Sequence, residues 1–160
     1  MKTTDLCDEN REQVQVADSI GFRHFGGRST FWGQIATVKC YEDNSLVKAA
    51  VSQNGRGKVL VVDGGGSLRC ALLGDIVAAL AQQNEWAGVL IYGAIRDSEA
   101  VAAIDIGVVA LSTNPRKSGK KNEGTANIPL HFAGIQFVPG QFIYLDADGI
   151  VTSAAALLPS

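Results

Sequence analysis

The sequence predicts one mixed α/β domain with a β-rich C-terminal third. In the middle of the chain, apolar strand-like runs alternate with helix-like segments, the pattern of a sheet with helical connections. From about residue 128, short alternating segments follow one another between turns, as in an antiparallel sheet. A chain of 160 residues with 46% hydrophobic content suits a single core. We therefore expect residues 1–160 to form one domain.

The first expected strand covers residues 34–40, where apolar and polar side chains alternate. The preceding stretch from residue 14 to residue 27 is polar and punctuated by glycines. Asn44 is placed to cap a helix with an apolar face over residues 46–51, which Asn54-Gly55 would end. The chain is thus expected to pass from a strand into a helix.

Two continuous apolar runs, residues 59–62 and 88–93, are typical of strands that are buried on both faces. Residues 75–83 lie between them and carry apolar side chains at helical spacing. A shorter helix over residues 98–104 and a strand over residues 108–111 would repeat the alternation. These segments predict a sheet with helical crossovers.

The C-terminal third is expected to be antiparallel. Turn signals occur at Ala133-Gly134, Pro139-Gly140 and Asp148-Gly149, and residues 115–127 form the one long loop. The short strands are expected over residues 129–132, 135–138 and 142–145.

Composition narrows the class of partner. The 14 basic and 16 acidic residues nearly cancel, which argues against wrapping of nucleic acid or an anionic membrane. Cys7, Cys40 and Cys70 have no spacing of a zinc or redox motif, so reduced thiols in the cytoplasm are expected. No signal peptide or membrane-crossing run is apparent. A small molecule or a protein is the favoured partner.

The strongest candidate site follows the two buried strands. Residues 63–66 and residues 93–97 would meet at one edge of the sheet, where α/β proteins bind ligands. Gly74-Asp75-Ile76-Val77 opens a helix, whose free amides suit a carboxylate, although Asp75 is equally read as a plain N-cap. Arg96-Asp97 is either a structural ion pair or a functional pair, with Asp97 on a cation and Arg96 on an oxyanion. The glycines at 64–66 match no nucleotide-binding fingerprint.

Other polar residues have simpler interpretations. His24 and His131 are isolated and are expected to be packing residues, and no local motif supports a Cys-His nucleophile. Lys39 and Lys58 could form a Schiff base only if they were buried. A basic cluster is interpreted as a solvated loop, with a mobile lid or a partner contact as the alternative; its members are Arg116, Lys117, Lys120 and Lys121.

Several motifs together resemble the regulator of ribonuclease activity A family, which also contains the 4-hydroxy-4-methyl-2-oxoglutarate aldolases. The likeness runs through nearly the whole chain in order. The motifs are Thr4-Asp5-Leu6-Cys7-Asp8, Phe25-Gly26-Gly27-Arg28, Gly33-Gln34-Ile35, Gly55-Arg56-Gly57, Val61-Val62-Asp63-Gly64-Gly65-Gly66-Ser67 and Asp75-x20-Arg96-Asp97.

The resemblance implies a three-layer β/β/α sandwich with a mixed central sheet, assembled as a homotrimer or hexamer with sites between subunits. Carried over by residue, it implies that Gly74, Asp75, Ile76 and Val77 seat the substrate carboxylate. It also implies that Arg96 contacts the 2-oxo group and that Asp97 binds Mg²⁺ or Mn²⁺. These roles agree with the expectation from strand ends and helix amides.

The implied activity is that of a metal-dependent lyase. It would release pyruvate from 4-hydroxy-4-methyl-2-oxoglutarate by retro-aldol cleavage and decarboxylate oxaloacetate through the same enolate, with Asp75 passing a proton through water. Full-length aldolases of the family add a C-terminal acidic residue to a neighbouring site, whereas this chain stops at Ser160, so the preferred substrate stays open. The alternatives are a protein-binding inhibitor of ribonuclease E and an inactive structural homologue.

Overall fold

The computed structural model describes residues 1–159. Its helices are α1 (Thr3–Glu9), α2 (Ser45–Val51), α3 (Asp75–Gln83) and α4 (Ser98–Ala102). The strands of the large sheet are β1 (Val14–Val16), β2 (Arg23–His24), β3 (Phe31–Lys39), β4 (Lys58–Asp63), β5 (Ala71–Leu73), β6 (Gly88–Ile95), β7 (Gly107–Thr113), β8 (Thr125–Ala126), β11 (Phe142–Asp146) and β12 (Gly149–Ser153). A separate hairpin consists of β9 (Leu130–Phe132) and β10 (Ile135–Phe137).

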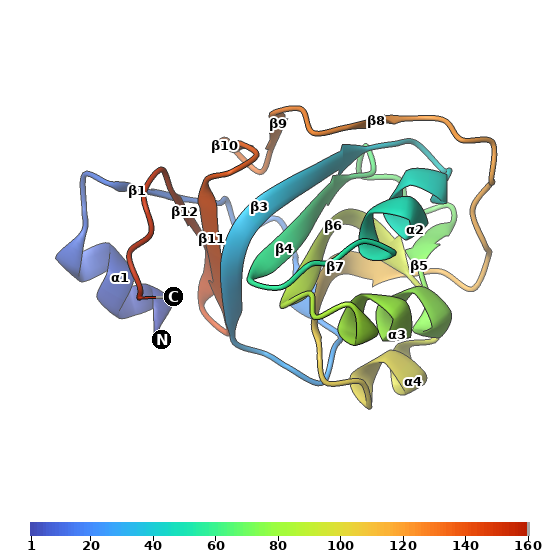
Figure 1. Cartoon of the computed structure of the whole chain (residues 1–160), viewed down its shortest axis with the longest axis horizontal. Helices are drawn as coiled ribbons and strands as arrows, with labels where there is room; N and C mark the ends of the chain where they lie inside the picture. Colours follow the sequence, from blue (N-terminus) through green and yellow to red (C-terminus); the bar gives the residue numbers. More distant parts are fainter. Residues whose placement is uncertain (160) are drawn as a thin grey trace.

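The large sheet is mixed (Figure 1). Its strand order is β1-β12-β11-β3-β4-β6-β7-β2, while β5 pairs with β6 and β8 with β3. The central strands β3, β4, β6 and β7 are parallel, and the flanking strands β1, β12, β11 and β2 are antiparallel to their neighbours. The carboxyl ends of the parallel strands therefore share one edge, which is where the candidate residues were expected to meet.

Three layers are stacked around two cores, as the resemblance implied. Helices α2, α3 and α4 lie together on one face of the sheet (Figure 1), and their apolar side chains pack on Leu60, Val62 and Ile91. The β9–β10 hairpin covers the other face, where its apolar residues pack on Val59 and Val61. The alternate residues of β4 thus serve opposite cores, which explains why this strand reads as a continuous apolar run.

The main elements predicted from the sequence are confirmed, including the strand, helix, strand unit and the antiparallel C-terminal third. Some boundaries differ. The strand predicted from residue 34 begins at Phe31. The ring of Phe31 fills the space over Gly88 of β6 and Gly107 of β7, which have no side chains. The helix predicted to reach residue 104 ends at Ala102, because the chain must turn into β7.

One capping prediction is wrong. The side chain of Asn44 makes no capping hydrogen bond to α2. The Oδ1 atom of Asp43 instead accepts a hydrogen bond from the backbone N–H of Ser45 at 2.9 Å. Asp43 is therefore the residue that satisfies the start of this helix, and the Asn44 amide is left for another role.

The polar N-terminal stretch holds more structure than its sequence indicates. Residues 3–9 form α1, in which Thr3 and Leu6 are buried. The backbone N–H and the hydroxyl of Thr3 each donate a hydrogen bond of 2.7 Å to the carboxylate of Asp146. This helix is held by contacts with the far end of the chain, which no local pattern reveals.

Candidate active site

Parallel pairing of β5 with β6 brings the two halves of the candidate motif together. The backbone N–H of Arg96 donates to the carbonyl of Leu73 at 2.9 Å, so the residue after β6 lies beside the end of β5. Gly74 then starts α3 as its N-cap residue, and Asp97 is the N-cap residue of α4. Both helices begin at this edge, so their positive dipole ends point toward one region.

Three polar side chains converge at the first turn of α3. Asp97 Oδ2 accepts a hydrogen bond of 3.3 Å from the backbone N–H of Asp75. The same oxygen lies 4.0 Å from Nε of Arg96. The sequence thus correctly predicted that residues 74–77 and 96–97 share a crevice. The arrangement contains the Arg96–Asp97 ion pair, but both side chains remain about two-fifths exposed and accessible to a ligand.

The interpretation of Asp75 as a plain N-cap is wrong, because Gly74 occupies that position. Asp75 is the first helical residue, and its Oδ1 accepts a hydrogen bond of 2.9 Å from the backbone N–H of Ile76. Two amides of this helix terminus are therefore engaged by carboxylates of the chain itself. The amides of this terminus thus bind carboxylate oxygens of the chain, as unpaired amides at a helix N-terminus commonly do.

Gly74 leaves room for the Asp97 carboxylate. A Cβ atom at this position would lie 2.6 Å from Asp97 Oδ2. Asp97 itself has a left-handed backbone, with φ 55° and ψ 43°. Strained backbone of this kind is concentrated at functional sites, and Asp is one of the residues that tolerates it. The turn therefore holds the Asp97 carboxylate over the start of α3.

The pocket around these residues has a volume of about 150 Å³. The sequence predicted six of its lining residues as site residues and missed the others, which come from the start of α2, β5 and the segment after β7. The lining consists of Asn44, Lys48, Ala71, Leu73, Gly74, Asp75, Ile76, Val77, Arg96, Asp97, Lys117, Ser118 and Lys120. Asn44 was predicted to cap a helix, and Lys117 and Lys120 lie in the segment that was interpreted as a solvated loop. None of the three was predicted to line a pocket.

The donor set fits a cation that keeps much of its own hydration. Among residues 1–159, no group of three or more His, Cys, Asp or Glu side chains could hold a metal ion. Mg²⁺ is commonly bound by one or two carboxylates, with water and substrate oxygens completing its shell. Asp97, with Asp75 nearby, matches that mode and does not match a zinc cage.

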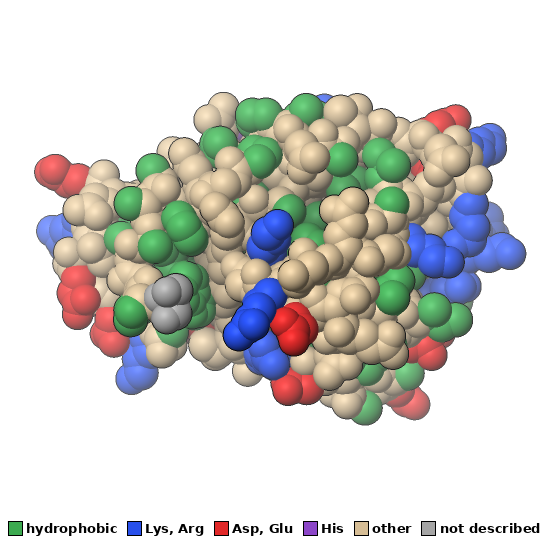
Figure 2. Space-filling model, in the orientation of Figure 1, with side chains coloured by type: hydrophobic (Ala, Val, Ile, Leu, Met, Phe, Trp, Pro, Cys, Tyr) green, Lys and Arg blue, Asp and Glu red, His purple; other side chains and the backbone are tan. Residues whose placement is uncertain are grey.

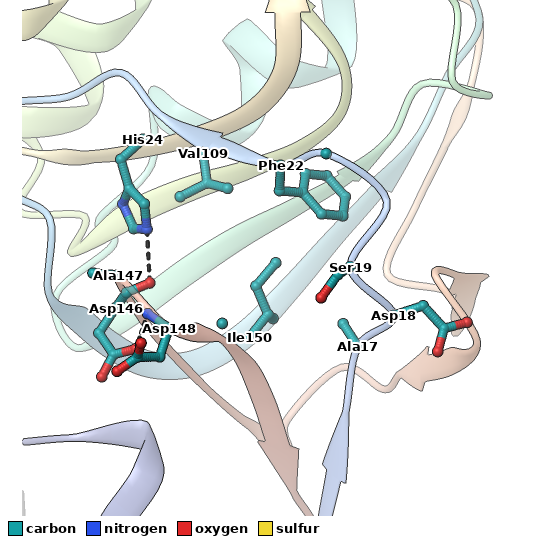
Figure 3. Close-up of a pocket in the computed structure, with 12 residues that line it drawn as sticks. Ala17, Asp18, Ser19, Phe22, His24, Val109, Asp146, Ala147, Asp148 and Ile150 are labelled. Carbon is teal, nitrogen blue, oxygen red and sulfur yellow. Dashed lines mark hydrogen bonds between the residues drawn. The ribbon is translucent and has the colours of Figure 1, made fainter.

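A second pocket, of about 370 Å³, lies between β2 and the β11–β12 turn (Figure 3). His24 reaches into it, and its Nε2 is 2.8 Å from the carbonyl oxygen of Asp146. The role of a packing residue expected for His24 agrees with its edge-on contact with Phe31. His131 is exposed on β9, away from both pockets.

The remaining nucleophile candidates are disfavoured. Burial raises the pKa of Cys40 to about 12, and burial also raises the pKa of Cys70. Both thiols are therefore protonated at neutral pH and are poor nucleophiles. Lys39 is exposed and Lys58 is only half-buried, so neither has the buried setting that a Schiff-base lysine needs. No helix in the described part of the chain is long and apolar enough to cross a membrane.

The fold and the pocket define a class: a mixed α/β domain with a pocket at the carboxyl ends of parallel strands, beside a helix N-terminus. The family model of the RraA-like proteins, described as Aldolase/RraA, matches residues 3–152. The chain belongs to the RraA-like family.

Relatives and solved structures agree with this assignment. A protein of Aromatoleum aromaticum, whose name proposes a 4-hydroxy-4-methyl-2-oxoglutarate aldolase, is 52% identical over 98% of both chains. One of Pseudomonas fluorescens with the same name is 54% identical over 97% of this chain and 94% of its own.

Two crystal structures are also similar. The structure of the RNA-processing inhibitor RraA from Thermus thermophilis has a TM-score of 0.94 and 41% identity, covering 100% of this chain and 95% of that one. A Geobacillus kaustophilus structure described as an S-adenosylmethionine:2-dimethylmenaquinone methyltransferase has a TM-score of 0.96 and 46% identity, covering 98% and 97%. The mixed α/β fold is thus shared across proteins with three different names.

Proposed function

We propose that this protein is a divalent-metal-dependent 4-hydroxy-4-methyl-2-oxoglutarate aldolase that also decarboxylates oxaloacetate. The observation that carries the proposal is the convergence of Asp75, Arg96 and Asp97 at the first turn of α3. The names of the relatives at 52% and 54% identity support the reaction class. The pocket suits a small 2-oxo acid, because helix amides and a guanidinium face the same space.

The first turn of α3 binds the carboxylate of the 2-oxo acid. Backbone amides of residues 74–77 supply the donors, and the helix dipole favours the negative charge. Arg96 lies across the turn and contacts the 2-oxo oxygen. The substrate is thereby oriented with its C3–C4 bond directed into the pocket.

Bond cleavage needs a base, a place for the electron pair and a proton donor. Asp75, acting through a water molecule, accepts the proton of the 4-hydroxyl group as the C3–C4 bond breaks. The electron pair of that bond becomes the enolate of pyruvate, which Arg96 stabilises. Asp75 then returns the proton to C3, which releases a second pyruvate. Oxaloacetate would reach the same enolate when its C3–C4 bond breaks and CO₂ leaves. No hydroxyl proton is taken up in that case, so the proton that reaches C3 would come from water through Asp75.

Asp97 is the proposed ligand of Mg²⁺ or Mn²⁺. When bound, the cation supplies Lewis-acid polarisation of the 2-oxo group. The position of Asp97 beside both Arg96 and the carboxylate seat fits this role, because a cation there would be shared by the protein and a chelating 2-oxo acid.

Pyruvate release tests the proposal. The purified protein should cleave 4-hydroxy-4-methyl-2-oxoglutarate with Mg²⁺ and lose the activity with excess chelator, and Mn²⁺ should restore it. Removing Arg96 in the Arg96→Ala variant should lower kcat by about 100-fold or more, the usual effect of losing an oxyanion-stabilising group. Activity that is indifferent to chelator, or unchanged in this variant, contradicts the proposal. A lysine adduct trapped by borohydride would indicate Schiff-base chemistry instead.

A second candidate function is inhibition of ribonuclease E by direct binding. It is favoured by the similarity to the RNA-processing inhibitor RraA. A cleavage assay with purified ribonuclease E tests it, and unchanged RNA cleavage at saturating protein rules it out. We propose a homotrimer or hexamer in the cytoplasm as the assembly that performs either role, and light scattering distinguishes these from a monomer.

A further inference from the structure

We propose that Lys48, Lys117 and Lys120 form a subsite for a second carboxylate of the substrate, remote from its 2-oxo acid end. All three line the same pocket as Arg96 and Asp97. The inference rests on the proposed function and deepens it, because it names the substrate class that this pocket selects. That class is 2-oxo acids that carry a further carboxylate group.

The charges in the pocket are unbalanced. Four cationic side chains and two carboxylates line it, and Arg96 is already paired with Asp97. None of the three lysines forms an ion pair with any residue in the range 1–159. All three lysines are exposed, so solvent screens their mutual repulsion, but each can turn its ammonium group toward an anionic ligand in the pocket. The pocket is therefore suited to more negative charge than one carboxylate supplies.

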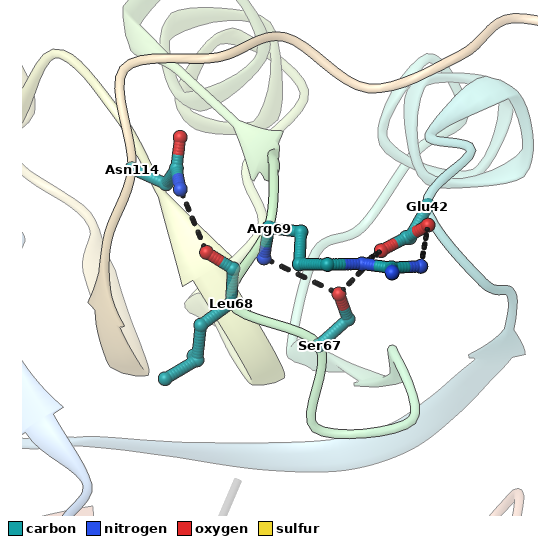
Figure 4. Close-up of polar contacts among 5 residues, drawn as sticks. All are labelled: Glu42, Ser67, Leu68, Arg69 and Asn114. Atoms are coloured by element: carbon teal, nitrogen blue, oxygen red, sulfur yellow. Dashed lines mark hydrogen bonds and ion pairs between the residues drawn. The ribbon is translucent and has the colours of Figure 1, made fainter.

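Arg69 provides a contrast just outside the pocket (Figure 4). Its guanidinium makes two hydrogen bonds to Glu42, of 2.6 Å and 2.8 Å. The hydroxyl of Ser67 donates to the same carboxylate at 2.7 Å. The charge of Arg69 is balanced by Glu42, whereas the three lysines that line the pocket pair with no acidic residue in the range 1–159.

Lys117 and Lys120 are exposed, as the interpretation of this segment as a solvated loop predicts, but its backbone is held by hydrogen bonds. The backbone N–H of Ala71 donates to the carbonyl of Arg116 at 2.8 Å, which extends the sheet beside β5. The backbone N–H of Gly119 donates to the carbonyl of Glu42 at 2.8 Å. Because the backbone that carries Lys117 and Lys120 is held in place, little backbone entropy is lost when a ligand binds. The charges of these lysines can therefore contribute to selectivity.

Asp43 links the segment that carries Lys117 and Lys120 to the start of α2. Its side chain is buried, and it accepts hydrogen bonds from the backbone N–H groups of Ser45 and Lys121. Burial raises the pKa of Asp43, but these hydrogen bonds and one from Glu123 outweigh burial, so its pKa lies below its usual value. The ionised carboxylate thus joins the helix that carries Lys48 to the segment that carries the other two lysines.

Asn44 is an independent sign of a ligand in this space. It is only 8% exposed, lines the pocket, and its Oδ1 has no hydrogen-bond partner. Buried polar atoms without partners are rare in native proteins. A side-chain amide has both donor and acceptor atoms, so Asn44 can bind a carboxylate oxygen or the 4-hydroxyl group. Lys and Arg side chains also gather at the edge of the molecule where the β7–β8 segment passes α2 (Figure 2).

Two substrates that differ only at the remote end test the proposal. The first is 4-hydroxy-4-methyl-2-oxoglutarate, and the second is 4-hydroxy-4-methyl-2-oxopentanoate, in which a methyl group replaces the remote carboxylate. With Mg²⁺ present, kcat/KM should favour the dicarboxylate by about tenfold or more, the usual effect of a hydrogen bond to a charged group. In the Lys120→Met variant, this preference should fall severalfold through loss on the dicarboxylate alone.

The matched control is Lys121→Met. Lys121 is exposed on the same segment but does not line the pocket. The preference of the Lys121→Met variant for the dicarboxylate should therefore equal that of the wild type. An unchanged preference in Lys120→Met, Lys117→Met and Lys48→Met overturns the subsite, provided that pyruvate is still released. No metal-dependent cleavage of either substrate would instead overturn the proposed function.

Inorganic sulfate separates a substrate carboxylate from a free anion as the occupant. Competitive inhibition of dicarboxylate cleavage, weakened in Lys120→Met, supports the subsite. Stimulation of dicarboxylate cleavage by sulfate overturns it, because the anion and the remote carboxylate would then bind at different places.

Discussion

The Oδ2 atom of Asp97 lies 3.3 Å from the backbone nitrogen of Asp75, although 22 positions separate them in the sequence. This contact joins the end of β6 to the first turn of α3. A carboxylate at that turn is stabilised by the helix dipole and by hydrogen bonds from backbone amides. The proposed metal ligand and the proposed carboxylate seat are therefore parts of one continuous site.

Enlarging Gly74 should disrupt this site without unfolding the protein. In Gly74→Ala, the new Cβ would lie 2.6 Å from Asp97 Oδ2, so the carboxylate must move. We expect pyruvate release to fall by about 100-fold, since small misplacements at a reacting centre have effects of that size. The control is Gly149→Ala, where a Cβ meets no atom within 4 Å. Equal activity in both variants would contradict the packing argument.

Asp97→Asn removes the charge while keeping a residue that tolerates a left-handed backbone. We expect the apparent affinity for Mg²⁺ to fall by about tenfold or more, because a neutral amide binds the cation more weakly than a carboxylate. A Mg²⁺ titration of pyruvate release measures the change. The thermal midpoint should stay near that of the wild type, since Asp97 is about two-fifths exposed. A lowered kcat with unchanged Mg²⁺ dependence would exclude Asp97 as the ligand.

The convergence of residues 96–97 with residues 74–77 was predicted from local signals, because buried strands end abruptly and the charged residues at 96 and 97 follow at once. The strand that brings residues 74–77 to this edge, β5, was not predicted. The lysines at 117 and 120 were not recognised, because a segment rich in Lys, Gly and Asn resembles a solvated loop. Their place in the pocket depends on Asp43 and on backbone pairing with Ala71, which are contacts between distant segments.

Acid should loosen the N-terminal helix through Asp146. Burial raises the pKa of Asp146, but hydrogen bonds from Thr3, Asp148 and Gly149 outweigh burial, so its pKa lies below the usual 3.8. A lowered folded-state pKa stabilises the protein above about 3.8, and that stabilisation is lost as the pH falls through the folded value. Urea unfolding between pH 7 and pH 3 should therefore show a smaller change for Asp146→Asn than for the wild type.

The same variant should be less stable at pH 7 by about 2 kcal/mol, because the hydrogen bonds that Thr3 and the following turn donate to a charged acceptor are weakened. Asp148→Asn serves as its control, since that side chain is exposed on the same turn. If Asp146→Asn and the wild type have parallel pH profiles, Asp146 does not provide the acid sensitivity.

The ring of Phe31 occupies the space that a side chain at Gly88 or Gly107 would need. A Cβ at Gly88 or Gly107 would overlap the Phe31 ring, which is buried. Gly107→Ala should lower the free energy of unfolding by about 1–3 kcal/mol, the usual cost of overpacking a core. Adding Phe31→Leu should recover part of the loss by making room. A Gly107→Ala protein as stable as the wild type would contradict this packing argument.

A crystal structure with Mg²⁺ and pyruvate tests the central claim most directly. We expect density for a cation beside the Asp97 carboxylate, a pyruvate carboxylate at the amides of residues 74–77, and the guanidinium of Arg96 at the 2-oxo oxygen. A cation and a pyruvate bound elsewhere, with Asp97 still on the amide of Asp75, would contradict the assignment of this site.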